Sequence, residues 1–160
     1  MNKYQEHVFV LPEDEADREL ANGFALGLAP YDNRIQVLRE EGGWGSVVDK
    51  FKRDHVKPMR NYDKRYMVLL LDFDRYTDWC EKVRDSVPED LVDRVFVLGV
   101  DPNPEALQTA ELGTNEKVGM TLAEECRTGA EALWVHDLLK HNAGELKRMI
   151  PTVKQILFPQ

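Results

Sequence analysis

Four short apolar runs are the clearest pattern along the chain, and longer mixed stretches separate them. The runs cover residues 7–11, 34–39, 66–71 and 94–100. The third run is unbroken and rich in branched side chains, which is typical of a strand buried on both faces of a parallel sheet. The second alternates apolar and polar residues, which predicts a strand nearer the edge. We therefore expect about four strands.

The stretches between these runs have helical features. Residues 12–28 begin with a proline and several acids, as a first helical turn often does. A second helix is expected from about Val47, and Pro58 should kink or end it. A third is expected over residues 76–84. Because strands and helices alternate, the sequence predicts a parallel sheet with right-handed crossovers.

The last third of the chain is predicted to be mostly helical. Helices are expected over residues 105–111, 120–127, 130–141 and 143–158, the last of them bent at Pro151. The predicted fold class is therefore α/β, with a Rossmann-like parallel sheet of about four strands flanked by helices. Residues 1–160 should form one domain, with a core over about 7–100 and a helical extension over about 105–158.

Carboxylates follow the predicted strands at the edge where a parallel sheet binds ligands. Asp72 and Asp74 end the third strand, and residues two apart on a strand point to the same side. Ligands of open α/β sheets bind outside the carboxyl ends of the strands, and paired carboxylates supply the hard oxygen ligands that Mg²⁺ prefers. The alternative is that both residues only form a turn and cap the helix that follows.

Further acids follow the other strands. Glu13 and Asp17 come after the first strand, although acids are common in any first helical turn. Asp78 and Glu105 are two more acids that could join or replace Glu13 in a site. The glycine-rich stretch Glu41–Ser46 precedes a helix but matches neither the P-loop nor the dinucleotide fingerprint, so we interpret it as a flexible connection.

Composition excludes several classes of protein. The chain is 42% hydrophobic and 31% charged, as soluble globular proteins are. Its longest apolar run is too short to cross a bilayer and its first seven residues contain no signal-like core, so we expect a cytoplasmic protein without membrane contact. Cys80 and Cys126 have no partner at metal-binding spacing, which favours buried or half-buried thiols. His136 and His141 are five residues apart, which is not the spacing of a helical zinc pair.

Charge is distributed unevenly. The net charge of −8 argues against indiscriminate binding of polyanions. Seven basic residues nevertheless fall within residues 50–65, among only two acids. This clustering favours a surface that contacts nucleic acid, and the alternative is an ordinary solvated helix face. The candidate phosphate contacts are Lys50, Lys52, Arg53, Lys57 and Arg60.

The order of acids and strands resembles the Toprim domain of topoisomerases, primases and OLD-family nucleases, over about residues 7–100. In that family a Glu after the first strand and an Asp-x-Asp after the third gather around magnesium. The resemblance implies that Glu13, Asp72 and Asp74 are catalytic, and that these three and Asp17 bind Mg²⁺ or Mn²⁺. Two residues depart from the family pattern. Asp14 stands where Toprim domains usually carry Gly, and Pro12 is also unusual.

The resemblance implies Mg²⁺-dependent phosphodiester chemistry on nucleic acid. Topoisomerases and primases need further modules, for which 160 residues leave no room, so a small stand-alone nuclease that works beside a protein partner is the preferred interpretation. The alternative is a non-catalytic Toprim-like binding module that keeps the fold, with or without the metal. A receiver-like phosphoacceptor domain is a further alternative, but Lys117 lies too far past Val100 to serve as its lysine.

Overall fold

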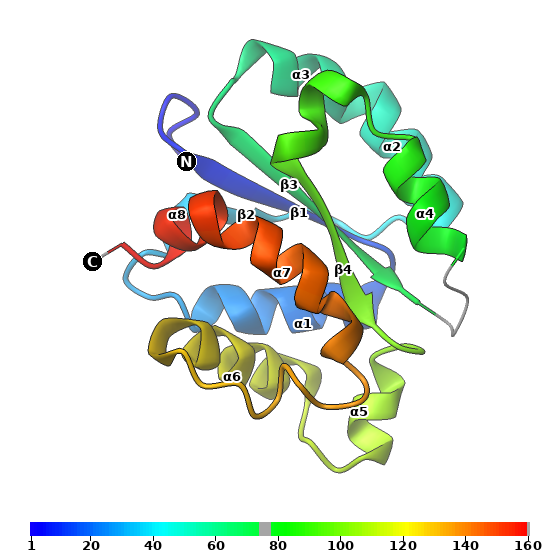
Figure 1. The fold of residues 1–160 in the computed structure, drawn as a ribbon, viewed down its shortest axis with the longest axis vertical. Helices are drawn as coiled ribbons and strands as arrows, with labels where there is room; N and C mark the ends of the chain where they lie inside the picture. Colours follow the sequence, from blue (N-terminus) through cyan, green and yellow to red (C-terminus); the bar gives the residue numbers. More distant parts are fainter. Residues whose placement is uncertain (74–77, 160) are drawn as a thin grey trace.

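The computed structural model describes residues 1–73 and 78–159, and its core is a four-stranded parallel sheet. The strands are β1 (His7–Pro12), β2 (Ile35–Val37), β3 (Arg65–Asp72) and β4 (Val95–Val100), in the spatial order β2-β1-β3-β4. The α/β prediction is confirmed, including the parallel strands and the helical last third (Figure 1).

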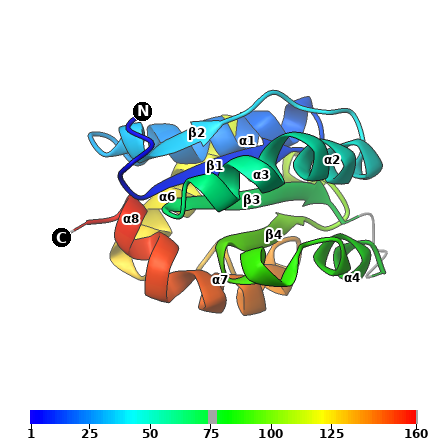
Figure 2. The same cartoon turned by 90° about the horizontal axis from the view of Figure 1, so that it is seen from above.

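Helices cover both faces of this sheet (Figures 1 and 2). Their bounds are α1 (Glu15–Leu26), α2 (Trp44–Lys50), α3 (Val56–Asn61), α4 (Asp78–Asp85), α5 (Glu105–Thr109), α6 (Asn115–Thr128), α7 (Ala143–Met149) and α8 (Gln155–Leu157). No helix in the described ranges is both long and apolar enough to span a bilayer.

Alternation of side chains along the strands divides the core into two layers. Met67, Leu69 and Leu71 of β3 pack in a cluster with residues of α2, α3 and α4. Val68 and Leu70 point to the other face and pack with residues of α1, α6 and α8. The unbroken apolar run of β3 is therefore explained by helices on both sides.

Two helices contain a π-helical turn beside a proline. Phe51–His55 is π-helical between α2 and α3, and the helix then continues through Pro58 to Asn61. Ile150–Lys154 is π-helical between α7 and α8 and includes Pro151. A proline lacks a backbone N–H and clashes with the preceding turn of a helix. A wider π-helical turn accommodates both effects, so the helix does not end there.

The helix expected over residues 130–141 is absent, and this prediction was wrong. Gly129 caps α6 in the left-handed conformation, with φ 82°, and turns follow up to a short 3₁₀ helix at Lys140–Asn142. The buried carboxylate of Glu125 accepts hydrogen bonds from the backbone N–H groups of Leu133 and Trp134. A side-chain carboxylate thus takes the place of the backbone carbonyls that would accept from these N–H groups in a helix. Local sequence patterns do not predict this exchange.

The C-terminal segment covers the outer edge of β4. The backbone N–H of Val97 donates to the Glu145 carboxylate at 2.8 Å, and that of Asp101 donates to the Leu138 carbonyl at 3.0 Å. Between them, the Asn142 amide accepts from Gly99 N–H at 3.0 Å and donates to Gly99 C=O at 2.8 Å. Side chains and loop backbone therefore make hydrogen bonds to β4 that a fifth strand would otherwise make, and they protect the open edge of the sheet.

Replacing Asn142 by Ala should lower the free energy of unfolding by about 2 kcal/mol, because it leaves the buried Gly99 N–H without its hydrogen-bond acceptor. Urea denaturation followed by circular dichroism would measure the loss. Asn115→Ala is the matched control, since the Asn115 amide oxygen is bonded only by the exposed Gln108 side chain. Equal stability of the two variants would contradict a structural role for the edge cover.

Candidate functional site

Four carboxylates meet where β1 and β3 end. Glu13, Asp14 and Asp17 come from the turn after β1 and the first turn of α1, and Asp72 is the last residue of β3. Each offers an oxygen that lies within 4.8 Å of the oxygens offered by the others. From β1 the chain first adds β2 on one side and later β3 on the other. The cluster therefore lies at the topological switch point, where open α/β sheets bind ligands.

Asp17 is the most unusual member of this acidic cluster. Its side chain is 0% exposed, and no described residue donates a hydrogen bond to either carboxylate oxygen. An ionised carboxylate in this position pays a large desolvation cost without compensation. The group is therefore stable only if it holds a proton or binds a cation.

Glu13 connects the two strands. Its backbone N–H donates to the Leu70 carbonyl at 2.9 Å, which continues the pairing of β1 with β3. Its side chain turns back, and Oε2 accepts a hydrogen bond from the backbone N–H of Asp72 at 2.9 Å. Glu13 is only 8% exposed, so this bond fixes the carboxylate beside Asp72.

Asp14 belongs to the cluster although the sequence analysis did not select it. It is the N-cap of α1, and its Oδ1 accepts from the backbone N–H of Asp17 at 2.9 Å. This hydrogen bond holds the first turn of α1 so that Asp17 faces β3. The preference of Asp for the N-cap, three residues before another acid, was the available signal.

The electrostatics of the cluster favour protons when no cation is bound. Burial is the main cause that raises the pKa of Asp17 far above its ordinary value, and the neighbouring carboxylates of Asp72 and Asp14 add to it. Burial is also the main cause that raises the pKa of Asp72, and the Asp14 and Glu13 charges add to it. Because carboxylates can hydrogen-bond to each other only through a proton, Asp17 and Asp72 share protons unless a cation replaces them.

The donor set fits a divalent metal ion. Hard cations prefer carboxylate oxygens, and four carboxylates from three short segments repel one another unless positive charge lies between them. The acidic cluster could therefore hold a divalent metal. The buried, unpartnered oxygens of Asp17 are the specific sign of this, because exposed acids alone are common on any protein.

Other predicted site residues lie elsewhere. Asp74 and the Asp78 side chain fall outside the described part of the structure. Glu105 is an exposed residue at the start of α5 and is not in the acidic cluster. His141 contacts the Gly99 carbonyl through Nε2 at 2.8 Å and packs on the Phe73 ring, and His136 Nδ1 accepts from the backbone N–H of Leu138.

The predicted phosphate contacts lie on the helix from Trp44 to Asn61 and fall into two groups. Lys50, Arg53 and Arg60 form ion pairs with Glu41, Asp54 and Asp90. Lys52 and Lys57 are exposed, and neither forms an ion pair with a described residue. Among the five predicted phosphate contacts, these two lysines therefore carry the positive charge that no ion pair with a described residue neutralises.

The glycine-rich stretch contacts the site through its backbone. Gly42 donates its N–H to the carbonyl of Glu13 at 2.7 Å, and it adopts φ 80°, which favours glycine. This bond ties the segment after β2 to the turn that carries Glu13 and Asp14.

Comparisons of the chain with protein-family models, with curated proteins and with solved structures gave no match. The interpretation of the site therefore uses its geometry.

Proposed function

We propose that this protein is a small Toprim-like nuclease that hydrolyses phosphodiesters in nucleic acid with the help of Mg²⁺ or Mn²⁺. The observation that carries the proposal is Asp17, a wholly buried carboxylate with no hydrogen-bond donor from a described residue, surrounded by three other carboxylates at the switch point of the sheet.

Each acid has a distinct part in this proposal. Asp17, which is wholly buried, would hold the cation without contacting substrate. Glu13 and Asp14 are held by hydrogen bonds to the backbone N–H groups of Asp72 and Asp17 and keep an oxygen for the cation. Asp72, like Asp14, is half-buried and so can be reached from solvent. When bound, the cation would polarise a phosphodiester and lower the pKa of a coordinated water.

The Toprim resemblance is consistent with this arrangement. The family pattern requires a Glu after the first strand beside an Asp after the third, and β1 and β3 are neighbours in the sheet. Asp14, which replaces the usual Gly, supplies a further acid and the helix cap. We infer that the departure strengthens the negative charge of the site, and we propose that a partner protein supplies substrate specificity.

The exposed lysines are the proposed phosphate contacts. Reversing both charges, in Lys52→Glu with Lys57→Glu, should reduce affinity for a single-stranded oligonucleotide about tenfold at low salt and lower the magnitude of the salt slope by about 1.4. Fluorescence anisotropy at several salt concentrations would measure both. Lys117→Glu with Lys147→Glu makes the same charge change at exposed positions outside residues 50–65. If both pairs weaken binding equally, only net charge matters.

A direct assay tests the nuclease itself. The protein is incubated with labelled single-stranded and duplex DNA and RNA, in Mn²⁺, in Mg²⁺ or in chelator. Metal-dependent cleavage that is lost in the site variants supports the proposal. Nucleic-acid binding that is the same in metal and in chelator, without cleavage of any substrate, supports the non-catalytic module instead.

A further inference from the structure

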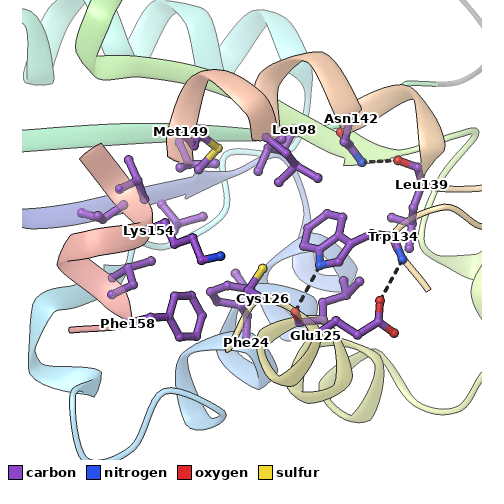
Figure 3. A pocket seen from close by; sticks show the side chains of 18 of the residues that line it. Phe24, Leu98, Glu125, Cys126, Trp134, Leu139, Asn142, Met149, Lys154 and Phe158 are labelled. Carbon is purple, nitrogen blue, oxygen red and sulfur yellow. Dashed lines mark hydrogen bonds between the residues drawn. The ribbon is translucent and has the colours of Figure 1, made fainter. Parts of the chain in front are cut away.

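An apolar cavity lies on the sheet face opposite α2 and α3, away from the acidic cluster. It occupies about 240 Å³ between the sheet, α1, α6 and the C-terminal helices (Figure 3). Its walls are apolar, with Leu98 on β4, Phe24 on α1, and Met149 and Phe158 on the C-terminal segment. None of Glu13, Asp14, Asp17 or Asp72 lines it.

One cation points into this apolar cavity. Figure 3 shows the Lys154 side chain extending across it, with its ammonium directed towards Cys126 on α6. Lys154 forms no ion pair with a described residue. Its charge acts on the Cys126 thiol, although burial dominates and raises the pKa of that thiol to about 11, so the thiol stays protonated.

The carboxylates at the cavity do not neutralise Lys154. Glu125 is buried, but its carboxylate accepts hydrogen bonds from the backbone N–H groups of Leu133 and Trp134. Glu131 lies on the exposed turn after α6. The cavity thus combines an apolar interior with one positive charge, that of the exposed Lys154, which forms no ion pair with a described residue. This combination matches a molecule with an alkyl chain and an anionic head.

We propose that this cavity binds a straight-chain monocarboxylate, with the alkyl chain against the sheet and the carboxylate beside Lys154. An apolar cavity of about 150 Å³ accepts benzene, or about 25 Å³ per carbon. At that density, 240 Å³ accommodates a chain of about nine or ten carbons. This inference does not depend on the nuclease proposal, because the two sites share no residue.

Isothermal titration calorimetry with hexanoate, octanoate, decanoate and dodecanoate, below their micelle concentrations, tests the cavity. Each added CH₂ should tighten binding about fourfold until the cavity is full, so affinity should rise from hexanoate to decanoate and then level off. Decanoate should bind more tightly than decanol or decylammonium, because only the carboxylate pairs with Lys154.

Three variants assign the binding to this cavity. Lys154→Met should weaken decanoate about fivefold without changing decanol, and Lys147→Met, at an exposed position that does not line the cavity, should change neither. Ala130→Trp, at an exposed lining position, should block every ligand while the protein remains folded. The proposal is overturned if binding does not saturate, if decylammonium binds as tightly as decanoate, or if Ala130→Trp leaves decanoate binding unchanged.

Discussion

In a metal-chelating buffer the Asp17→Asn variant should be more stable than the parent protein, and the difference should grow as the pH rises. Asn keeps the shape of the side chain but cannot ionise. In the parent, burial and the neighbouring carboxylates raise the pKa of Asp17 in the folded state, whereas in the unfolded chain this pKa is about 3.9.

The direction of this pH dependence follows from how many protons the folded and unfolded states bind. Below about pH 4, both states hold the Asp17 proton, and the parent resembles the Asn variant. Above that pH, the unfolded chain releases the proton while the folded protein retains it. The parent therefore loses up to about 1.4 kcal/mol of stability per pH unit until the raised pKa is reached. We expect Asp17→Asn to be more stable by about 3 kcal/mol at pH 7, or about 6 to 12 °C in melting midpoint.

The contribution of Asp17 to the pH dependence of stability must be separated from that of the histidines. Burial lowers the pKa of His7, His55 and His141, and groups of this kind lose stability as the pH falls below about 6.5. Both proteins contain these histidines, so the difference between them isolates Asp17. Melting curves from pH 5 to 8 would measure it, with Asp93→Asn as an exposed control. A difference that is independent of pH would show that Asp17 ionises normally.

Divalent cations should offset most of this difference. A ligand that binds only the folded state at one hundred times its dissociation constant stabilises that state by about 2.7 kcal/mol. Mg²⁺ or Mn²⁺ should therefore raise the midpoint of the parent, and more at pH 8 than at pH 5, because protons compete for the same oxygens. Asp17→Asn should lose most of this shift. An equal shift in both proteins would place the cation elsewhere.

Asp72→Asn should reduce cleavage of the best substrate about a hundredfold to a thousandfold. The substitution removes a charge from the proposed metal site, and the loss of a charged group that stabilises a transition state in a buried site costs about 10²–10³ or more in rate. The backbone N–H of residue 72, which holds Glu13 at 2.9 Å, remains in the variant. The change therefore alters charge while the strand pairing stays intact.

Glu105→Gln is the matched control for Asp72→Asn. Glu105 is an acid beyond the end of a neighbouring strand, but it is exposed and outside the acidic cluster. Its variant should cleave at nearly the parent rate. Initial rates under single-turnover conditions, with affinity measured separately, would distinguish lost chemistry from lost binding. Comparable losses in the two variants would refute the assignment of the site.

The sequence by itself determined the sheet and the side of it on which the acids gather. Runs of branched apolar residues can be buried only as strands between helices, and parallel strands deliver their carboxyl ends to one edge. For this reason Glu13, Asp17 and Asp72 could be placed together from their positions after strands. The sixteen-residue basic stretch was equally visible in the sequence, because the distribution of charge along a chain needs no coordinates.

Only the tertiary structure decided how each of these side chains is used. Asp17 is wholly buried because the first turn of α1 lies beside the end of β3, which is distant from it in the sequence. Folding brings Glu41 beside Lys50 and Asp90 beside Arg60, whereas Lys52 and Lys57 receive no such partner among the described residues. The irregular segment after Gly129 and the cavity beside Lys154 depend on contacts between residues distant in sequence. Local patterns fix periodicity, whereas burial and pairing are set by long-range packing.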